Sequence, residues 1–277
     1  MQKNAVIAVL CIIALICCYR LEQRVYKTRT YSYYQEQREN KYKGGLKETM
    51  EANPVLQDAM DENETYKLNM EQKVAYLTFD DGPSMVTKEV LKTLRENNIH
   101  ATFFLIGNQI DENTEEIVKQ LVEDGHTIGI HTYSHKGAEI YKSKDAFITD
   151  FEQTARRIKE VTGIEPKIFR FPWGSVNKYL GNIAEEVIEE LEEKGYTYFD
   201  WNVSAEDSVG KPTAESILRN VKKDYKKYKQ PVILMHDSSV NKLSAQMLPQ
   251  IIDIIRDAGY QFDTLDKMDK PYQYPRD

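Results

Sequence analysis

Two adjacent aspartates and two closely spaced histidines are the residues of this 277-residue chain best suited to binding a metal ion. Asp80 and Asp81 are neighbours, and His131 and His135 lie four positions apart. On a helical turn, that spacing puts both imidazoles on one face, and a carboxylate would complete a set of three ligands. Three protein ligands and an open position for water are the arrangement of catalytic zinc. Neighbouring side chains on an extended backbone point in different directions, so one Asp can reach the metal while the other faces the water as a general base.

Both motifs also have simpler interpretations. The segment Asp80-Asp81-Gly82-Pro83 fits an ordinary turn, because Asp, Gly and Pro are all turn formers. Two histidines four residues apart can simply be surface residues. The third histidine of interest, His236, ends an apolar run, where it is either a satisfied core group or a general acid with a pKa near neutrality. Asp207 or Asp237 is expected to orient it.

The elements that must position these side chains alternate between strand and helix from Lys73 onward. Short apolar runs predict strands at 74–79, 101–106, 127–130, 167–170, 196–201, 232–235 and 260–265. Apolar residues at helical spacing predict helices at 86–97, 113–124, 144–162, 182–194, 214–229 and 245–258. Four of these helices are followed directly by glycine, which is a signal for a left-handed C-cap.

Alternating strands and helices imply parallel strands joined by right-handed crossovers. With about seven such units, the expected fold is an α/β barrel or barrel-like sheet, and a doubly wound open sheet is the competitor. The carboxyl ends of barrel strands meet at one rim, where active sites form. The polar clusters of the chain all follow predicted strands: 80–81, 131–135, 170–174, 200–207 and 236–237. No glycine-rich phosphate loop follows the first strand, which weakens a nucleotide-binding interpretation.

Charge and cysteine usage narrow the function further. The net charge of -7 argues against nucleic-acid binding, but it is compatible with a neutral glycan. All three cysteines lie before residue 19, so the chain beyond them has no disulfide framework, thiolate metal site or cysteine nucleophile. A metal there must be held by His and carboxylates, which suit zinc and also fit cobalt, manganese or nickel. Nothing in the sequence implies a protein partner.

The motif Thr78-Phe79-Asp80-Asp81-Gly82-Pro83-Ser84, together with His131-Thr132-Tyr133-Ser134-His135, resembles the NodB-homology polysaccharide deacetylases of carbohydrate esterase family four. Three further motifs match in order: Arg170-Phe171-Pro172-Trp173-Gly174, Asp200 to Asp207, and Leu234-Met235-His236-Asp237. The resemblance covers roughly Lys73 to Leu265, and five ordered motifs are much more specific than any one of them. It implies a deformed (β/α) barrel and an activity like that of peptidoglycan N-acetylglucosamine deacetylases.

The resemblance also implies roles for the residues of the metal site. Asp81, His131 and His135 would bind a divalent metal, with zinc as the first choice. Asp80 would be the base that activates water. Arg170 would pair with Asp80 and hold it ionised by lowering its pKa.

For the acid and the substrate, the resemblance assigns a second set of residues. His236 would protonate the leaving amine, with its pKa raised by Asp207. The Trp173 backbone N–H would stabilise the oxyanion, and Leu234 would line the pocket for the acetyl methyl group. Trp173 and Trp201 would offer faces to sugar rings, although core packing is an equal alternative for Trp201. Many relatives have Trp where this chain has Ser208, so another residue closes that side of the pocket or the pocket is more open.

The expected function is therefore metal-dependent hydrolysis of N-acetyl groups on a cell-envelope polysaccharide, either peptidoglycan or another N-acetylglucosamine polymer. One alternative is an O-acetyl polysaccharide esterase on the same fold. Another is a catalytically inactive glycan-binding protein, which would lack a metal ligand or the base. The presence of all of these residues counts against that second alternative.

The first 72 residues are expected to tether this catalytic domain, residues 73–277, to a membrane. The apolar run Ala5 to Cys18 is short for a full span and is in the range of a signal sequence. It ends without the small residues of a cleavage site, so residues 1–19 are interpreted as an uncleaved signal-anchor. Residues 20–72 are rich in charged residues, Gln and Tyr. This composition predicts a polar stalk.

The orientation of this anchor is less simple. Basic residues are denser after the apolar run than before it, which by itself favours a cytoplasmic C-terminal side. Large domains can translocate despite flanking charge, and the expected substrate lies outside the cell. We therefore expect a single-pass protein of the cell membrane with an extracellular catalytic domain.

Overall fold

The computed structural model describes residues 73–276. The expected signal-anchor at 1–19 and the polar stalk at 20–72 lie outside the described residues. Within 73–276, no helix combines the length and the apolar character needed to cross a membrane.

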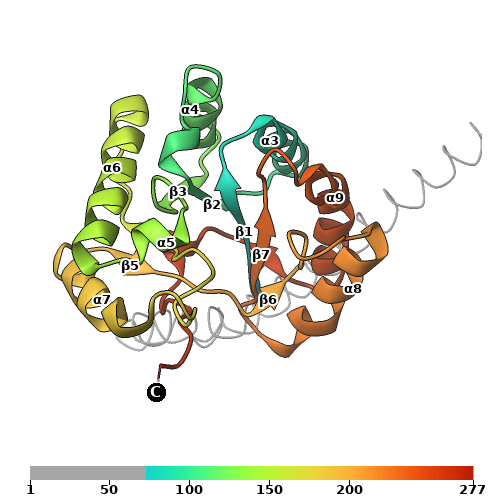
Figure 1. Ribbon diagram of the computed structural model, residues 1–277. Coiled ribbons are helices and arrows are strands. Elements are labelled where there is room, and N and C mark those ends of the chain that lie inside the picture. The colour runs from blue at the N-terminus through green and yellow to red at the C-terminus, as the bar shows by residue number, and fades with distance from the viewer. Residues whose placement is uncertain (1–72, 277) are drawn as a thin grey trace, which may run out of the picture. The chain divides into compact units, whose positions relative to one another are not determined.

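An eight-stranded, all-parallel sheet forms the centre of the described domain (Figure 1). Its strands are β1 (Val74–Gly82), β2 (Thr102–Leu105), β3 (Thr127–Ile130), β4 (Ile168–Phe169), β5 (Thr197–Tyr198), β6 (Val203–Ser204), β7 (Val232–His236) and β8 (Gln261–Phe262). Their order is β5-β4-β3-β2-β1-β7-β6, and β8 pairs with β1. Because β5 and β6 stand at opposite ends of this order, the curled sheet stays open between them. The expectation of a deformed barrel is confirmed.

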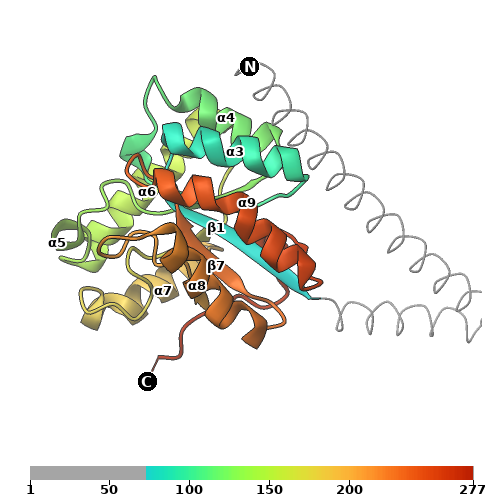
Figure 2. The same ribbon diagram turned by 90° about the vertical axis from the view of Figure 1, so that its right-hand side faces the viewer.

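Helices surround the outer side of the curled sheet (Figure 1). They are α3 (Met85–Asn97), α4 (Glu115–Glu123), α5 (Gly137–Ile140), α6 (Lys144–Thr162), α7 (Ala184–Glu193), α8 (Ala214–Asp224) and α9 (Lys242–Asp257). The first and last of these, α3 and α9, lie side by side along β1 (Figure 2). The N-terminal part of the domain is thereby packed against its C-terminal part.

Strong sequence patterns predicted the elements well. Strand β3 and helix α6 have the predicted bounds. Strands β4, β5 and β8 are only two residues long, because pairing ends sooner than the apolar runs do. The predicted helix 214–229 ends at Asp224, where a short 3₁₀ turn takes over. Strand β6 and helix α5 were not predicted, because two and four residues are too short to show a periodic pattern.

The alternation of β1 side chains puts polar groups inside the curled sheet. Residues that face the helices join the main hydrophobic core: Ala75, Leu77 and Phe79. Tyr76 faces the opposite way, into a smaller inner cluster with Phe104, Ile168, Phe199, Val232 and Leu265. Thr78 and Asp80 follow Tyr76 on this inner face because side chains of a strand alternate with a period of two. The inner face therefore changes from apolar to polar towards the carboxyl end of the strand.

The C-terminal segment 272–274 supports the loop that follows β4. The Asp200 N–H donates to the carbonyl of Tyr272 over 2.8 Å, and the Asp200 carboxylate accepts from the Tyr274 N–H over 2.8 Å. The same carboxylate accepts from the Ser175 N–H and Oγ at 2.8 and 2.6 Å. A Cβ at Gly174 would lie 3.2 Å from the Tyr274 ring, so glycine allows the segment to pack closely against this loop.

Candidate active site

The two aspartates at the end of β1 have different conformations. The register of β1 with β2 shifts between Asp80 and Gly82, as in a β-bulge, and Asp81 has a φ of 71° in the left-handed region. Asp80 is buried, whereas Asp81 is partly exposed. The bulge, rather than simple strand alternation, gives the two carboxylates their different directions.

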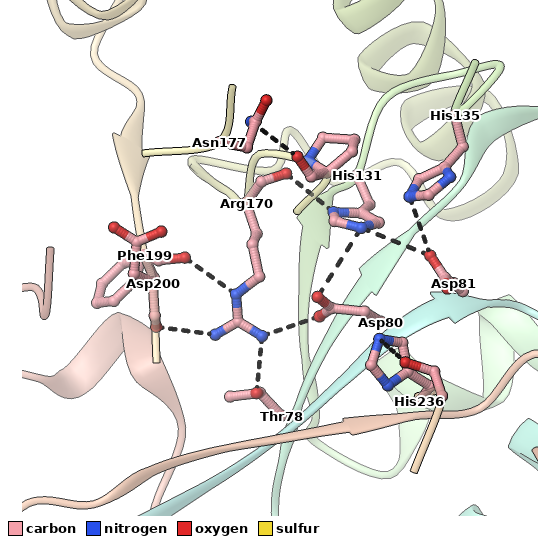
Figure 3. A network of polar contacts seen from close by, with 12 residues as sticks. Thr78, Asp80, Asp81, His131, His135, Arg170, Asn177, Phe199, Asp200 and His236 are labelled. Carbon is pink, nitrogen blue, oxygen red and sulfur yellow. Dashed lines mark hydrogen bonds and ion pairs between the residues drawn. The ribbon is translucent and has the colours of Figure 1, made fainter. Parts of the chain in front are cut away.

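Asp81, His131 and His135 converge on one point (Figure 3). The Oδ1 atom of Asp81 lies 3.5 Å from His131 Nε2 and 3.4 Å from His135 Nε2. This oxygen is buried and has no hydrogen-bond donor among the described residues. A buried acceptor that faces two imidazole nitrogens needs a cation or a donor, because an unpaired buried polar group is costly. These three residues therefore fit a divalent metal.

His131 is held in the protonation state that a metal ligand needs. Its Nδ1 lies 2.9 Å from the backbone carbonyl of Arg170, so Nδ1 carries the proton and Nε2 turns its lone pair to the site. Burial, followed by the neighbouring His135, lowers the pKa of His131 to about 3. The imidazole is therefore neutral across the physiological pH range.

The loop that carries the two histidines is not a helical turn, so that part of the prediction was wrong. Thr132 and His135 both have positive φ, of 66° and 54°, which bends the loop and brings the rings to a centroid distance of 5.1 Å. The Asp150 carboxylate of α6 accepts from the N–H groups of Tyr133 at 2.5 Å and Ser134 at 3.2 Å. Sequence reasoning missed Asp150, because nothing distinguishes it from the other charged residues of α6.

Arg170 lies beneath the site, completely buried (Figure 3). One guanidinium nitrogen donates to Asp80 Oδ1 at 2.9 Å and to Thr78 Oγ1 at 2.8 Å. The others donate to the carbonyls of Phe199 at 2.9 Å and Asp200 at 3.1 Å. These contacts fix the guanidinium, which in turn fixes the Asp80 carboxylate. The expected pairing of Arg170 with Asp80 is confirmed.

Two opposing effects act on the pKa of Asp80. Burial raises the pKa of this carboxyl, and the charges of Arg170 and His236 lower it, but burial is the larger effect. The expected lowering of the pKa by the ion pair is present, but it is outweighed by the desolvation of the fully buried carboxylate, which the sequence expectation left out. A raised pKa suits a general base, which works best when its pKa is close to the working pH.

His236, at the end of β7, is paired with Asp207. Its Nδ1 lies 2.8 Å from Asp207 Oδ1, and its backbone N–H donates to Asp207 Oδ2 at 2.8 Å. Burial lowers the pKa of His236, but the hydrogen bond and charge of Asp207 outweigh it and raise the pKa to about 9. Ser244 Oγ also donates to the Asp207 carboxylate at 2.5 Å. The side-chain amide of Asn241 donates to the backbone carbonyl of Asp207 at 3.0 Å. The structure thus favours Asp207 over Asp237 as the partner of His236.

Asp237 instead stabilises the turn between β1 and α3 through hydrogen bonds. Its carboxylate accepts from Thr87 Oγ1 at 2.5 Å, and its carbonyl accepts from Ser84 Oγ at 2.6 Å. Its backbone N–H donates to the Asp80 carbonyl at 3.1 Å. Burial raises the pKa of the Asp237 carboxyl to about 7.

Ser208 lies beside Nε2 of His236. Its Oγ is 3.3 Å from His236 Nε2, and the side chain is exposed to solvent. The position at which many relatives carry a large aromatic residue therefore holds a small hydroxyl group here.

The three residues expected to contact substrate differ in exposure and packing. Trp173 is 49% exposed, and its ring centroid is 4.8 Å from that of His135. Leu234 is buried and stands in register with Thr78 on the inner face, directly before the level of Asp80. Trp201 packs against Tyr274, with ring centroids 5.4 Å apart, and against the inner hydrophobic cluster. These contacts favour the packing role for Trp201.

Known proteins share this domain. A family model described as polysaccharide deacetylase matches residues 67–198. A peptidoglycan-N-acetylglucosamine deacetylase of Bacillus cereus is 33% identical over 202 residues, which is 70% of this chain and 69% of that protein. The chain belongs to the polysaccharide deacetylase family.

Solved structures of a deacetylase and of an esterase have the same fold. The catalytic domain of a peptidoglycan N-acetylglucosamine deacetylase from Eubacterium rectale is 34% identical, with a TM-score of 0.69 over 73% of this chain and 93% of that one. A carbohydrate esterase family four esterase from Streptococcus mutans is 29% identical, with a TM-score of 0.63 over 73% of this chain and 90% of that one. The family predicted from the motifs is confirmed, and this polysaccharide deacetylase is a hydrolase.

Proposed function

We propose that this deacetylase hydrolyses N-acetyl groups of an N-acetylglucosamine polymer of the cell envelope, with peptidoglycan as the first candidate, and releases acetate. The peptidoglycan N-acetylglucosamine deacetylases among its relatives support the substrate class. The observation that carries the chemistry is the convergence of Asp81, His131 and His135 next to the buried Asp80.

In this proposal, Asp81, His131 and His135 hold a divalent metal. Zinc is the first choice, and cobalt, manganese and nickel fit the same ligands. Such an ion, when bound, polarises the acetyl carbonyl and lowers the pKa of a bound water. The protein contributes one anionic and two neutral ligands, with the His131 tautomer fixed by the Arg170 carbonyl.

The acid and base of the proposed reaction come from two neighbouring strands. Asp80 takes a proton from the attacking water as the water oxygen bonds to the acetyl carbon. His236 then gives its Nε2 proton to the sugar nitrogen as the carbon–nitrogen bond breaks, leaving a free amine and acetate. Arg170 holds the Asp80 carboxylate in place, and Asp207 keeps His236 protonated before the transfer.

The substrate is positioned in this proposal by the loop after β4 and by β7. The Trp173 backbone N–H donates to the oxyanion of the tetrahedral intermediate. Leu234 contacts the methyl of the acetyl group, and the exposed ring of Trp173 contacts the sugar.

Acetate release from purified full-length protein tests the proposal. Peptidoglycan, chitin oligomers and an O-acetylated xylan are each incubated with the enzyme, with and without a chelator. We expect acetate from the N-acetylated substrates, loss of activity with chelator, and recovery when zinc is added back. Activity that survives the chelator refutes the metal mechanism. Acetate from the xylan alone favours the O-acetyl esterase alternative, and glycan binding without any acetate favours the inactive binding protein.

We also propose that residues 1–19 anchor the enzyme in the cell membrane, with the catalytic domain outside the cell. The apolar run Ala5 to Cys18 and the polar segment after it support this arrangement. Fractionation of intact cells, followed by protease treatment from outside, tests it. Recovery of the protein in the soluble cytoplasmic fraction would exclude this location.

A further inference from the structure

Asp200 lies where the curled sheet is open. It belongs to the connection between β5 and β6, which stand at opposite ends of the strand order. Within residues 73–276, β5 pairs only with β4 and β6 pairs only with β7. Strand pairing therefore does not fix the backbone of this connection from both sides, and other contacts must hold it.

Every polar atom of Asp200 has a partner, and the residue is completely buried. Its N–H donates to the Tyr272 carbonyl at 2.8 Å, and its carbonyl accepts from Arg170 at 3.1 Å. Its carboxylate accepts from the Ser175 N–H and Oγ at 2.8 and 2.6 Å, and from the Tyr274 N–H at 2.8 Å. One buried residue thus joins the loop after β4, the guanidinium beneath the site and the C-terminal segment.

The contact with Arg170 leads to the proposed base. One guanidinium nitrogen donates to the Asp200 carbonyl, and another donates to Asp80 Oδ1 at 2.9 Å (Figure 3). The guanidinium is planar and rigid, so its two ends move together. A shift of the Asp200 backbone would therefore change the direction in which Asp80 is held.

The contacts with Ser175 lead to the proposed oxyanion donor. Trp173 and Gly174, directly before Ser175, have φ of 65° and 83°, in the left-handed region. That conformation is unfavourable for a bulky residue such as Trp, so it persists only where the surroundings hold it. Ser175 is buried, and both its N–H and its Oγ donate to Asp200. Asp200 therefore holds the bend that carries the Trp173 N–H.

We propose that Asp200 is a positioning residue of the reaction, and that the C-terminal segment 272–274 completes the active site through it. Held from the C-terminal side, Asp200 keeps two groups in place at once: the guanidinium that directs the base, and the loop that donates to the oxyanion. This inference rests on the proposed function. It goes beyond that function by assigning a role in turnover to a residue that acts only through Arg170 and Ser175.

The first test measures kcat, KM and metal content of the full-length Asp200→Asn protein on a β-linked N-acetylglucosamine tetramer. The substitution keeps the size of the side chain but replaces one acceptor oxygen with an NH2 group that faces N–H donors. We expect kcat per metal-loaded molecule to fall about 10- to 100-fold, with KM and metal content nearly unchanged, because two reacting groups lose their alignment. An unchanged kcat per metal-loaded molecule would overturn the proposal, since a purely structural residue changes only the amount of folded protein.

A matched pair of variants at position 274 tests the C-terminal segment, even if Asp200→Asn does not fold. Tyr274→Pro removes the N–H that donates to Asp200, as well as the ring that packs on Trp201. Tyr274→Ala removes the ring alone. We expect kcat of Tyr274→Pro to be about three- to tenfold below that of Tyr274→Ala, because only the former loses the hydrogen bond. Equal kcat in the two variants would exclude the segment from the site.

Hydrogen exchange separates failure of this inference from failure of the proposed function, because it needs no activity. Amide exchange is measured by mass spectrometry on peptides that cover residues 171–176 in wild type, Tyr274→Pro and Tyr274→Ala. Faster exchange of this loop in Tyr274→Pro than in Tyr274→Ala supports the link through Asp200, even if no acetate is released in any assay. Equal exchange in the two variants would overturn the link and leave the deacetylase proposal intact.

Discussion

Asp80 of β1 and His236 of β7 are register partners on adjacent parallel strands. The proposed base and acid are thus separated by the spacing of a sheet, rather than by the conformation of two loops. Backbone hydrogen bonds on both strands fix that spacing, and Arg170 and Asp207 fix the side chains. This arrangement keeps the two groups ready before substrate arrives.

The first prediction concerns the division of roles between the two aspartates. Asp80→Asn should lower kcat by roughly 10²- to 10⁴-fold and leave metal affinity nearly unchanged, because it removes only the base. Asp81→Ala should lower metal affinity, because it removes the anionic ligand. Metal content by mass spectrometry and acetate release are measured on both variants. Equal loss of metal from the two would show that the division of roles is wrong.

Arg170 gives a prediction for stability. Arg170→Met leaves the Asp80 carboxylate buried without its cationic partner, which should lower the free energy of unfolding by about 3–5 kcal/mol. The partly exposed ion pair of Arg157 and Glu115 provides the control, and Arg157→Ala should cost about 1 kcal/mol. Denaturant titration measures both changes. If Arg170→Met costs no more than Arg157→Ala, Arg170 does not neutralise Asp80.

The pH dependence of turnover should report the pair of His236 and Asp207. The acid must be protonated, and Asp207 raises the pKa of His236 to about 9, so kcat/KM should fall as the pH rises through about 9. Asp207→Asn removes this charge and should move the fall to lower pH. Asp145→Asn, at an exposed carboxylate of α6, should leave the profile unchanged. An alkaline limb that is the same in wild type and Asp207→Asn would assign the acid to another group.

The same pair of His236 and Asp207 stabilises the folded protein, and this contribution depends on pH. The pKa of His236 is higher in the folded protein than the ordinary value of 6.5. Its contribution is therefore fully present below pH 6.5 and is lost as the pH rises through about 9. Unfolding curves of wild type and Asp207→Asn across this range should converge at high pH. A difference that does not change with pH would indicate a contribution from packing alone.

A second histidine, far from the site, should make the domain sensitive to acid. Burial is the main cause that lowers the pKa of His126 from 6.5 to about 4, and its Nδ1 accepts from the Ala101 N–H at 3.1 Å. Between pH 6.5 and 4 the unfolded chain binds a proton that the folded chain does not, so stability falls with falling pH by up to about 1.4 kcal/mol per unit. His126→Gln should reduce this slope, whereas Lys92→Gln, at an exposed residue of α3, should not. Identical slopes in all three proteins would contradict the prediction.

Periodicity and strand ends predicted much of the site, because both are local properties of the sequence. The segments that carry Asp80, His131 and His236 follow long apolar runs, and the fold brings them together as expected. The conformation of the histidine loop was predicted wrongly, since the left-handed backbone at Thr132 depends on the carboxylate of Asp150 in a later helix. No local pattern records such a contact.

Contacts between distant segments also explain the other differences between the predicted and the observed site. The pKa of Asp80 depends on how deeply the fold buries it, and residue spacing contains no measure of depth. The support given by Asp200 to Ser175 and Tyr274 joins three distant segments, and each of them alone reads as loop. Tertiary contacts of this kind can be identified only in the folded structure.

The central position of β1 has a consequence for how the chain reaches its folded state. One edge of β1 pairs with β2, which follows soon in the sequence, but the other edge waits for β7, and the bond from Thr78 to Ile233 spans 155 residues. During synthesis, the edge of the strand that carries both aspartates therefore stays unpaired until most of the domain has been made. Such distant pairing slows folding, and an unpaired edge is open to association with other chains. The strand that carries the proposed base and one proposed metal ligand thus needs protection before the domain is complete.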